Sequence, residues 1–459
     1  MSIRLSRRHM IESIGGGLGA VGLAGLWSDV FGAEPGAANL AHYAGPKLPA
    51  KAKHVIMLYL NGGPSQLDMF DPKPALFKYA GQRPNAVDLR TERTTGGLMP
   101  SPFEFKRYGR GGIEVSELLP QLASVIDEIT VIRSMYTFNP THTPGRAILH
   151  TGSVLATRPS IGSWVTYGLG TENQNLPSFV ALGSAPPGGP QTRAGFLPAE
   201  FQGVGFGVAD PDPERIIPNL RNKLIDPASQ RIDMDALLAL NQAQEKSFGH
   251  DQFLEGRIKS METAYRMQFE ALDLFDIRKE PQNICDEYGP TAFGTGCLLA
   301  RRLVEAGVRY VNVEYPGGQA WDDHSNLNNN LRKRCPDMDQ AAAALIRDLK
   351  RRGKLDETIV VWGGEFGRTP VSESGSGRDH NPYGYTMFVA GGGFKGGMAY
   401  GATDEFGFKA EQNRVSVHDL HATLLGQLGM DHTKLTYRYA GRDFRLTDVH
   451  GEIVRDILA

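Results

Sequence analysis

Cysteine and unbalanced charge are what this sequence has least of. Among 459 residues there are only three cysteines, Cys285, Cys297 and Cys335, and they form no CxxC pair. Their odd number leaves at least one thiol free, so a disulfide framework is excluded and a thiolate metal site is disfavoured. Lysine and arginine total 49 against 51 aspartates and glutamates, a formal net charge of −2. This balance lacks the basic excess that is typical of nucleic-acid-binding proteins.

The rest of the composition is that of a globular protein. Hydrophobic residues make up 41% of the chain and charged residues 22%, which excludes wholesale disorder. Glycine is the one excess, with 55 residues. A surplus of permissive backbone is expected where many strand ends and loops converge on a site.

The N-terminal segment has the features of an export signal. Arg7 and Arg8 precede a glycine-rich, mildly apolar stretch, residues 14–27, which is too short and too weakly apolar for a membrane span. The order Ser-Arg-Arg-His-Met-Ile resembles the twin-arginine motif, which directs folded proteins across the inner membrane. We therefore expect a signal over residues 1–38, a linker over residues 39–52, a periplasmic or exported mature protein and no stable membrane span. The alternative is a basic amphipathic helix at the start of a cytosolic protein.

Short apolar runs alternate with longer helical segments in the rest of the chain. Residues 54–61 form a continuous apolar run, typical of a strand buried on both faces, and similar runs occupy residues 129–135, 309–315 and 358–362. Helical patterns separate these runs. We therefore predict an α/β fold over residues 53–459, with a mainly parallel sheet and helices on both faces. Residues 183–282 are loop-rich and then charged and helical, which indicates an insertion in this domain.

Polar residues follow several of the predicted strands. Asn61 ends the first strand, Asp322 and His324 follow the strand near residue 315, and Glu365 follows the strand that ends at residue 362. His380 comes further on, in a glycine-rich segment that we expect to be a loop. In open α/β sheets functional groups gather beyond the carboxyl ends of the strands. Carboxylates and imidazoles gathered in this way are ligands for a divalent cation, and the pattern predicts such a site.

Each polar cluster has a plainer interpretation when it is taken alone. An Asp-His pair in a loop is often only a turn or surface feature. Glu365 is close enough in sequence to Arg368 to form an ordinary ion pair with it. Three clusters in order, each after a strand, favour the metal site.

Two longer motifs resemble those of the alkaline phosphatase superfamily, which includes the sulfatases. The segment THTPGRAILHTG, residues 141–152, resembles the sulfatase signature C-x-P-S-R-x-x-L-L-T-G, and VHDLHATLLGQLG, residues 417–429, resembles a late superfamily helix. From about residue 53 to residue 446 the chain is more specifically similar to the bacterial domain of unknown function 1501. The motifs that carry this second resemblance are HVIMLYLNGGPSQLDMFDPKP, RSM, HTGS, PSIGSWVTYGLGTENQNLPSFV, WGGEFGRTP and GRDH.

The resemblance implies metal-binding roles for the same polar residues. Asp322 and His324 look like the pair that serves one metal. Glu365 stands where relatives carry a metal-binding pair, and His380 stands where a further histidine faces the metal or the phosphate. Asn61 departs from the pattern, because relatives end the first strand with a metal-binding aspartate. A neutral amide is a weaker ligand and balances no cationic charge.

The nucleophile position also departs from the superfamily pattern. Aligned on Arg146, it holds His142 in place of the usual cysteine, serine or threonine, so formylglycine chemistry is excluded. An imidazole can accept a phosphoryl group, ligate a metal or transfer a proton. The alternatives are attack by Thr141, by Thr143 or by a metal-bound hydroxide. Arg146 would hold an anionic substrate, with Asp379 as a second substrate-binding candidate.

These inferences lead to one main functional prediction and two alternatives. The main prediction is an exported hydrolase of sulfate or phosphate esters that depends on zinc, magnesium, manganese or calcium. Its substrate would be a small anionic ester, for example a sulfated or phosphorylated carbohydrate, and not a nucleic acid. The first alternative is a non-catalytic metal- or ligand-binding protein on the same fold. The second is a cytosolic phosphomutase, which requires the twin arginines to be accidental.

Overall fold

The computed structural model describes residue 45 and residues 48–87, 90–173, 175–183, 189–217, 225–248 and 252–459. The predicted signal segment, residues 1–38, lies outside these residues, as does part of the predicted linker. None of the described helices combines the length and the apolar character that crossing a membrane needs.

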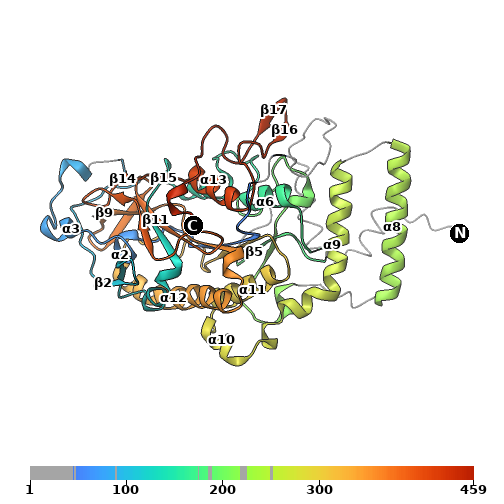
Figure 1. The fold of residues 1–459 in the computed structure, drawn as a ribbon, viewed down its shortest axis with the longest axis horizontal. Helices are drawn as coiled ribbons and strands as arrows, with labels where there is room; N and C mark the ends of the chain where they lie inside the picture. Colours follow the sequence, from blue (N-terminus) through green and yellow to red (C-terminus); the bar gives the residue numbers. More distant parts are fainter. Residues whose placement is uncertain are drawn as a thin grey trace.

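A mainly parallel sheet forms the centre of the protein (Figure 1). β11 (Tyr385–Ala390) runs antiparallel to both of its neighbours, whereas the other pairs of this sheet that the structure describes are parallel. This confirms the predicted fold class. The strand order is β12 (Met398–Tyr400), β4 (Ile129–Tyr136), β11, β8 (Thr358–Gly363), β1 (His54–Tyr59), β7 (Tyr310–Glu314), β5 (Phe179–Leu182) and β6 (Val204–Phe206), with β15 (Val415–Ser416) also paired to β4.

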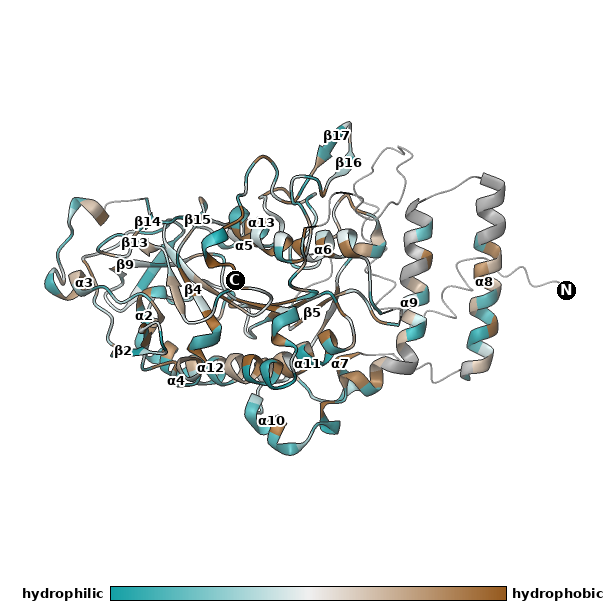
Figure 2. Cartoon of the chain, viewed as in Figure 1, coloured by the Kyte–Doolittle hydropathy of each residue, from teal (hydrophilic) through white to brown (hydrophobic). Residues whose placement is uncertain are grey.

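Helices cover both faces of the sheet, as predicted, and carry hydrophobic and hydrophilic residues side by side (Figure 2). In β1, Ile56 and Leu58 pack into one core, and Val55, Met57 and Tyr59 pack into the other. Successive side chains of a strand point to opposite faces, so a strand buried on both faces needs the continuous apolar run that this segment has. One face carries α4 (Pro120–Ser124), α10 (Gln282–Tyr288), α11 (Ala292–Glu305) and α12 (Leu327–Arg351), and the other carries α5 (His142–Thr151), α6 (Ile161–Leu169) and α13 (Val417–Gln427).

The predicted insertion, residues 183–282, is joined to the main domain by a strand and a helix. β6 extends the sheet beside β5. The sequence pattern did not distinguish the β6 segment from the surrounding loops. α8 (Pro227–Phe248) and α9 (Gln252–Phe275) stand together at one end of the molecule (Figure 1). α9 places Met267, Ala271 and Phe275 in the core beneath the sheet.

A small antiparallel hairpin lies just after β8 in the chain and carries several of the predicted site residues. It consists of β9 (Gly367–Glu373) and β10 (Gly377–Asn381). His380 is therefore on a strand. The sequence analysis expected it to lie in a loop, which is wrong. The hairpin is anchored by a fully buried ion pair, in which Arg378 Nε lies 2.9 Å from Asp68 Oδ2. Asp68 belongs to the short helix α2 (Gln66–Met69), which follows β1.

Candidate metal centre

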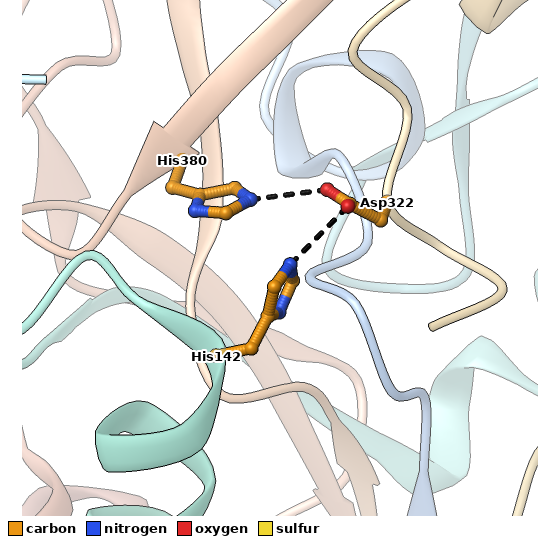
Figure 3. A group of neighbouring side chains, drawn as sticks. All are labelled: His142, Asp322 and His380. Atoms are coloured by element: carbon orange, nitrogen blue, oxygen red, sulfur yellow. Dashed lines mark hydrogen bonds and ion pairs between the residues drawn. The ribbon is translucent and has the colours of Figure 1, made fainter. Parts of the chain in front are cut away.

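Asp322 lies at the centre of the candidate site (Figure 3). Its Oδ1 lies 3.0 Å from His380 Nε2 and 2.8 Å from His324 Nε2, and its Oδ2 lies 3.3 Å from His142 Nε2. The three histidines come from different elements: the first turn of α5, the loop after β7 and strand β10. Arg368 contributes a fourth contact, with Nη2 2.7 Å from Asp322 Oδ1. The structure thus brings together three of the five predicted ligands, with His142 beside them.

Gly62 allows the loop that carries Asp322 to approach the end of β1. Its φ of +112° is in the region that favours glycine, and a Cβ there would lie only 2.7 Å from the backbone nitrogen of Asp322. Any larger residue would therefore move Asp322 away from the histidines.

Each histidine is held on the side that faces away from Asp322. His142 Nδ1 lies 2.7 Å from Glu365 Oε1, and His324 Nδ1 makes a short contact with Glu373. His380 Nδ1 lies 2.6 Å from the carbonyl of Pro140. When Nδ1–H donates to such an acceptor, Nε2 keeps its lone pair, and metal-binding histidines are oriented in this way.

Two of the three ring nitrogens that face Asp322 fit a metal better than they fit hydrogen bonds, whereas His380 Nε2 lies at hydrogen-bond distance from Asp322 Oδ1, 3.0 Å. His142 Nε2 and His324 Nε2 are buried and make no hydrogen bond, although both lie close to the carboxylate. Two groups of possible ligand atoms lie within 4.8 Å of one another: His142 with Asp322 and His380, and His324 with Asp379 and His380. Mixed nitrogen and carboxylate donors suit zinc, manganese or magnesium, and the histidines disfavour a pure calcium cage.

The electrostatics of the cluster are those of a concentrated ion-pair network. Burial opposes ionisation of Asp322, but the close contacts with His142, His324 and His380 hold its pKa well below the usual range. Burial also opposes the charge on His142, yet Asp322 and Glu365 raise its pKa to about 9. Burial lowers the pKa of His380, which favours the neutral ring that a metal requires.

Glu365 lies beside the cluster with both of its oxygens occupied. Oε1 accepts from His142 and, at 3.1 Å, from the backbone N–H of Gly62. Oε2 accepts from the Tyr59 hydroxyl at 3.0 Å and from the same Gly62 N–H at 3.2 Å. The side chain is fully buried and belongs to neither ligand group. Its position is that of a residue that orients His142. Arg368 pairs with Asp322. The plainer interpretation, in which Arg368 pairs with Glu365, is therefore wrong.

Asn61, the fifth predicted ligand, points to a different partner. Its amide nitrogen donates to Glu314 Oε1 at 2.8 Å and to the carbonyl of Tyr315 at 3.2 Å. Its oxygen accepts from the backbone N–H of Ala320 at 3.3 Å. Asn61 is fully buried and, like Glu365, belongs to neither ligand group.

The two predicted substrate-binding residues differ in their surroundings. Asp379 is fully buried, accepts from the backbone N–H of Arg93 at 2.7 Å and lies 4.0 Å from His324 Nδ1, so it belongs with the possible ligands. Arg146 is partly buried one turn after His142, and its Nε has no hydrogen-bond partner. Thr143, an alternative nucleophile, is exposed.

Three partner residues were missed by the sequence analysis: Tyr59, Glu92 and Glu373. Glu92 lies 2.6 Å from His380 Nδ1. Each lies in a segment with no recognisable metal-binding spacing, so only the fold shows its role.

The fold is that of an α/β protein with its polar site at the strand ends. The chain matches the model of the family described as "Protein of unknown function (DUF1501)" over residues 52–458, and it belongs to that family. No curated protein matches the sequence.

Solved structures with a similar arrangement are sulfatases and other alkaline phosphatase-superfamily enzymes. A sulfatase from Pseudoalteromonas sp. is 13% identical, with a TM-score of 0.34 over 93% of this chain and 77% of its own. A lipoteichoic acid synthase from Listeria monocytogenes is 9% identical, with a TM-score of 0.36 over 89% of this chain and 77% of its own. The alkaline phosphatase from the Antarctic bacterium TAB5 is 11% identical, with a TM-score of 0.28 over 77% of this chain and 95% of its own. Likenesses at this level carry no information about substrate.

Proposed function

We propose that the protein is a metal-dependent hydrolase of sulfate or phosphate esters, or of a related anionic ester. The supporting observation is the arrangement of His142, His324 and His380 around Asp322. Each ring offers Nε2 to the same side, and each is held at Nδ1 by an oxygen acceptor. A surface ion-pair cluster does not need this orientation, whereas a metal centre does.

In this proposal one divalent cation is held by His142, Asp322 and His380, and Asp379 with His324 offers a neighbouring position. When bound, the cation would polarise a substrate oxygen and lower the pKa of a water or hydroxyl group.

Arg146 would bind the anionic group of the substrate. It stands in the second turn of α5, whose N-terminal N–H groups also favour an anion. Among the described residues no hydrogen bond or ion pair involves the Arg146 side chain, so its guanidinium is available. The proposed substrates are sulfated or phosphorylated carbohydrates, or other small esters with one anionic group.

His142 has three roles open to it, and its Nε2 can fill only one of them at a time, because a ring nitrogen that binds a cation has no lone pair left. As a ligand, His142 would hold the metal through Nε2. As a nucleophile, the same Nε2 would attack the phosphorus or sulfur, the alcohol would leave, and water would then release phosphate or sulfate from the ring. As a proton-transfer group, the ring would donate a proton to the leaving alcohol or accept one from the attacking water.

The test combines metal content with turnover of aryl phosphate and aryl sulfate. We expect the purified protein to contain a divalent metal and to hydrolyse one of these esters, and His142→Ala to abolish turnover. Loss of the metal as well would make His142 a ligand, and a retained metal would make it the nucleophile or the proton-transfer group. Thr143→Ala is the matched control, because the exposed neighbouring hydroxyl should be dispensable. Metal-free, inactive wild-type protein would refute the proposal.

A non-catalytic metal-binding protein is the second candidate. The observation that favours it is Asn61, which donates to Glu314 and so supplies no anionic ligand at the end of β1. Bound metal without turnover across a panel of phosphate, sulfate and phosphonate esters would support this candidate.

Export by the twin-arginine route is a separate proposal, and it depends on Arg7 and Arg8 alone. Replacing both by lysine should leave the protein in the cytosol, whereas the wild-type protein should reach the periplasm. Wild-type protein that stays unprocessed in the cytosol would instead favour the phosphomutase.

A further inference from the structure

Tyr59 is linked to the metal centre through Glu365. It is the last residue of β1, and its side chain is fully buried in the core that α5 covers. The His150 ring packs edge-on against the Tyr59 ring, with 4.7 Å between centroids. The hydroxyl donates to Glu365 Oε2 at 3.0 Å.

The hydrogen bond from Tyr59 occupies one oxygen of Glu365 and so fixes the rotation of the carboxylate that faces His142. The N–H of Gly62 lies 3.1 Å from Oε1 and 3.2 Å from Oε2, so it does not distinguish between them. Tyr59 binds Oε2 alone, which leaves Oε1 for His142 Nδ1 at 2.7 Å. Without the hydroxyl, the carboxylate would be free to turn about its last bond.

We infer that Tyr59 is a positioning residue of the metal centre, because it fixes the Glu365 carboxylate so that His142 presents Nε2 to the cation. This inference rests on the proposed metal-dependent function. In this arrangement Tyr59 orients Glu365, Glu365 orients His142, and His142 faces the metal.

A merely structural role does not account for the bond. Tyr385 is also almost fully buried, and its hydroxyl has no hydrogen-bond partner among the residues that the structure describes. A buried tyrosine hydroxyl in this core therefore does not need a protein partner, and burial alone does not require Tyr59 to reach Glu365. Burial, with the charge of Glu365, also holds the pKa of Tyr59 well above its usual value, so the hydroxyl stays a donor.

The test compares Tyr59→Phe with Tyr385→Phe in metal-stripped full-length protein. The two variants each remove one buried hydroxyl, and only the first removes a contact with Glu365. We expect Tyr59→Phe to weaken Zn²⁺ affinity about tenfold, at the lower end of the effect of losing a group that bonds a metal ligand directly, because Tyr59 acts through Glu365. We expect Tyr385→Phe to bind Zn²⁺ like the wild type. The visible spectrum of the Co²⁺-loaded protein should change in Tyr59→Phe alone, because the ligand geometry relaxes.

The outcomes separate this inference from the function on which it rests. If the wild type binds Zn²⁺ and both variants bind it equally well, with unchanged Co²⁺ spectra, the positioning role is wrong and the metal centre stands. If the wild type binds neither metal, both fail. Should Tyr59→Phe not fold, Glu365→Gln tests the link through which Tyr59 acts, since the amide offers one acceptor atom in place of two. Unchanged Zn²⁺ affinity in Glu365→Gln overturns the inference.

Discussion

Asn61 donates its side-chain amide to Glu314 across the ends of two neighbouring parallel strands, with 2.8 Å between Nδ2 and Oε1. β1 and β7 pair in register at Tyr59 and Glu314, so Asn61 is placed just past its partner. Burial raises the pKa of Glu314, and the bond from Asn61 partly offsets that effect. The amide therefore stabilises the pair, whereas an aspartate at this position would place two buried carboxylates in contact.

The first prediction follows from this pair. Asn61→Asp, which introduces a carboxylate at the end of β1, should destabilise the protein by about 1–3 kcal/mol at pH 8, because a donor becomes a repelling acceptor. The measurement is urea unfolding. Asn61→Asp combined with Glu314→Gln should recover most of the loss, since the roles of donor and acceptor are then exchanged. A single variant as stable as the wild type would contradict the pairing.

Arg368 supports the second prediction. Its guanidinium is fully buried and donates to the carbonyls of Gly63, Trp321 and Arg378 at 2.9–3.0 Å, besides pairing with Asp322. Lysine has the charge but not the fork of donors. We expect Arg368→Lys to lower the free energy of unfolding by about 2–4 kcal/mol, because several buried acceptors lose their partner.

The matched control for this prediction is Arg332→Lys, whose side chain pairs with Glu117 at the surface. An exposed pair contributes at most about 1 kcal/mol, so this change should be nearly silent. Equal effects of the two substitutions in thermal or urea unfolding would show that the buried hydrogen bonds of Arg368 do not stabilise the fold as we expect.

How much of this arrangement was predictable differs between its parts. The strand at residues 54–59 and the gathering of Asp322, His324 and His380 followed from the sequence, because a buried strand needs a continuous apolar run and strand ends meet at one edge of the sheet. The partner of Asn61 did not follow. Which strand lies beside β1 is set by long-range pairing, and β7 is 253 residues away in the chain.

The residues that orient the histidines carry no local signal. Tyr59 is indistinguishable in sequence from any other core residue of a buried strand, and Glu373 lies in a segment that gave no helix or metal motif. Their roles depend on the direction of a hydroxyl or a carboxylate in space. For Glu365, the sequence predicted its position after β8. It did not predict the hydrogen bonds to Tyr59 and His142, because these depend on side chains far away in the chain.

The third prediction concerns acid stability and rests on two buried histidines, His150 in α5 and His421 in α13. Burial lowers the pKa of His421 to about 3 from 6.5, and burial, with Arg146, lowers that of His150 equally far. In the unfolded chain these two histidines take up protons below about pH 6.5, whereas in the folded protein they do so only near pH 3. Stability should therefore fall as the pH drops through this window, by up to about 1.4 kcal/mol per pH unit for each histidine.

His421→Gln tests this directly, since an amide can still donate to the carbonyl of Leu149, as His421 Nε2 does at 2.8 Å. Free energies of unfolding measured in urea from pH 7 to pH 4 should decline less steeply in the variant. His450→Gln, at an exposed histidine, should keep the wild-type slope. Parallel curves for all three proteins would mean that His421 takes up its proton in the folded state too.

The last prediction separates the substrate role of Arg146 from a structural one. Its Nε has no hydrogen-bond partner, so Arg146→Met should change the free energy of unfolding by less than about 0.5 kcal/mol. If Arg146 holds the anion, the same change should lower kcat/KM for an aryl sulfate or phosphate at least about tenfold, because a charge-assisted pair is lost. Bound metal should be unaffected, since Arg146 belongs to neither ligand group. A clear loss of stability with unchanged kcat/KM would place Arg146 in the framework of the fold and leave the substrate's charge to another group.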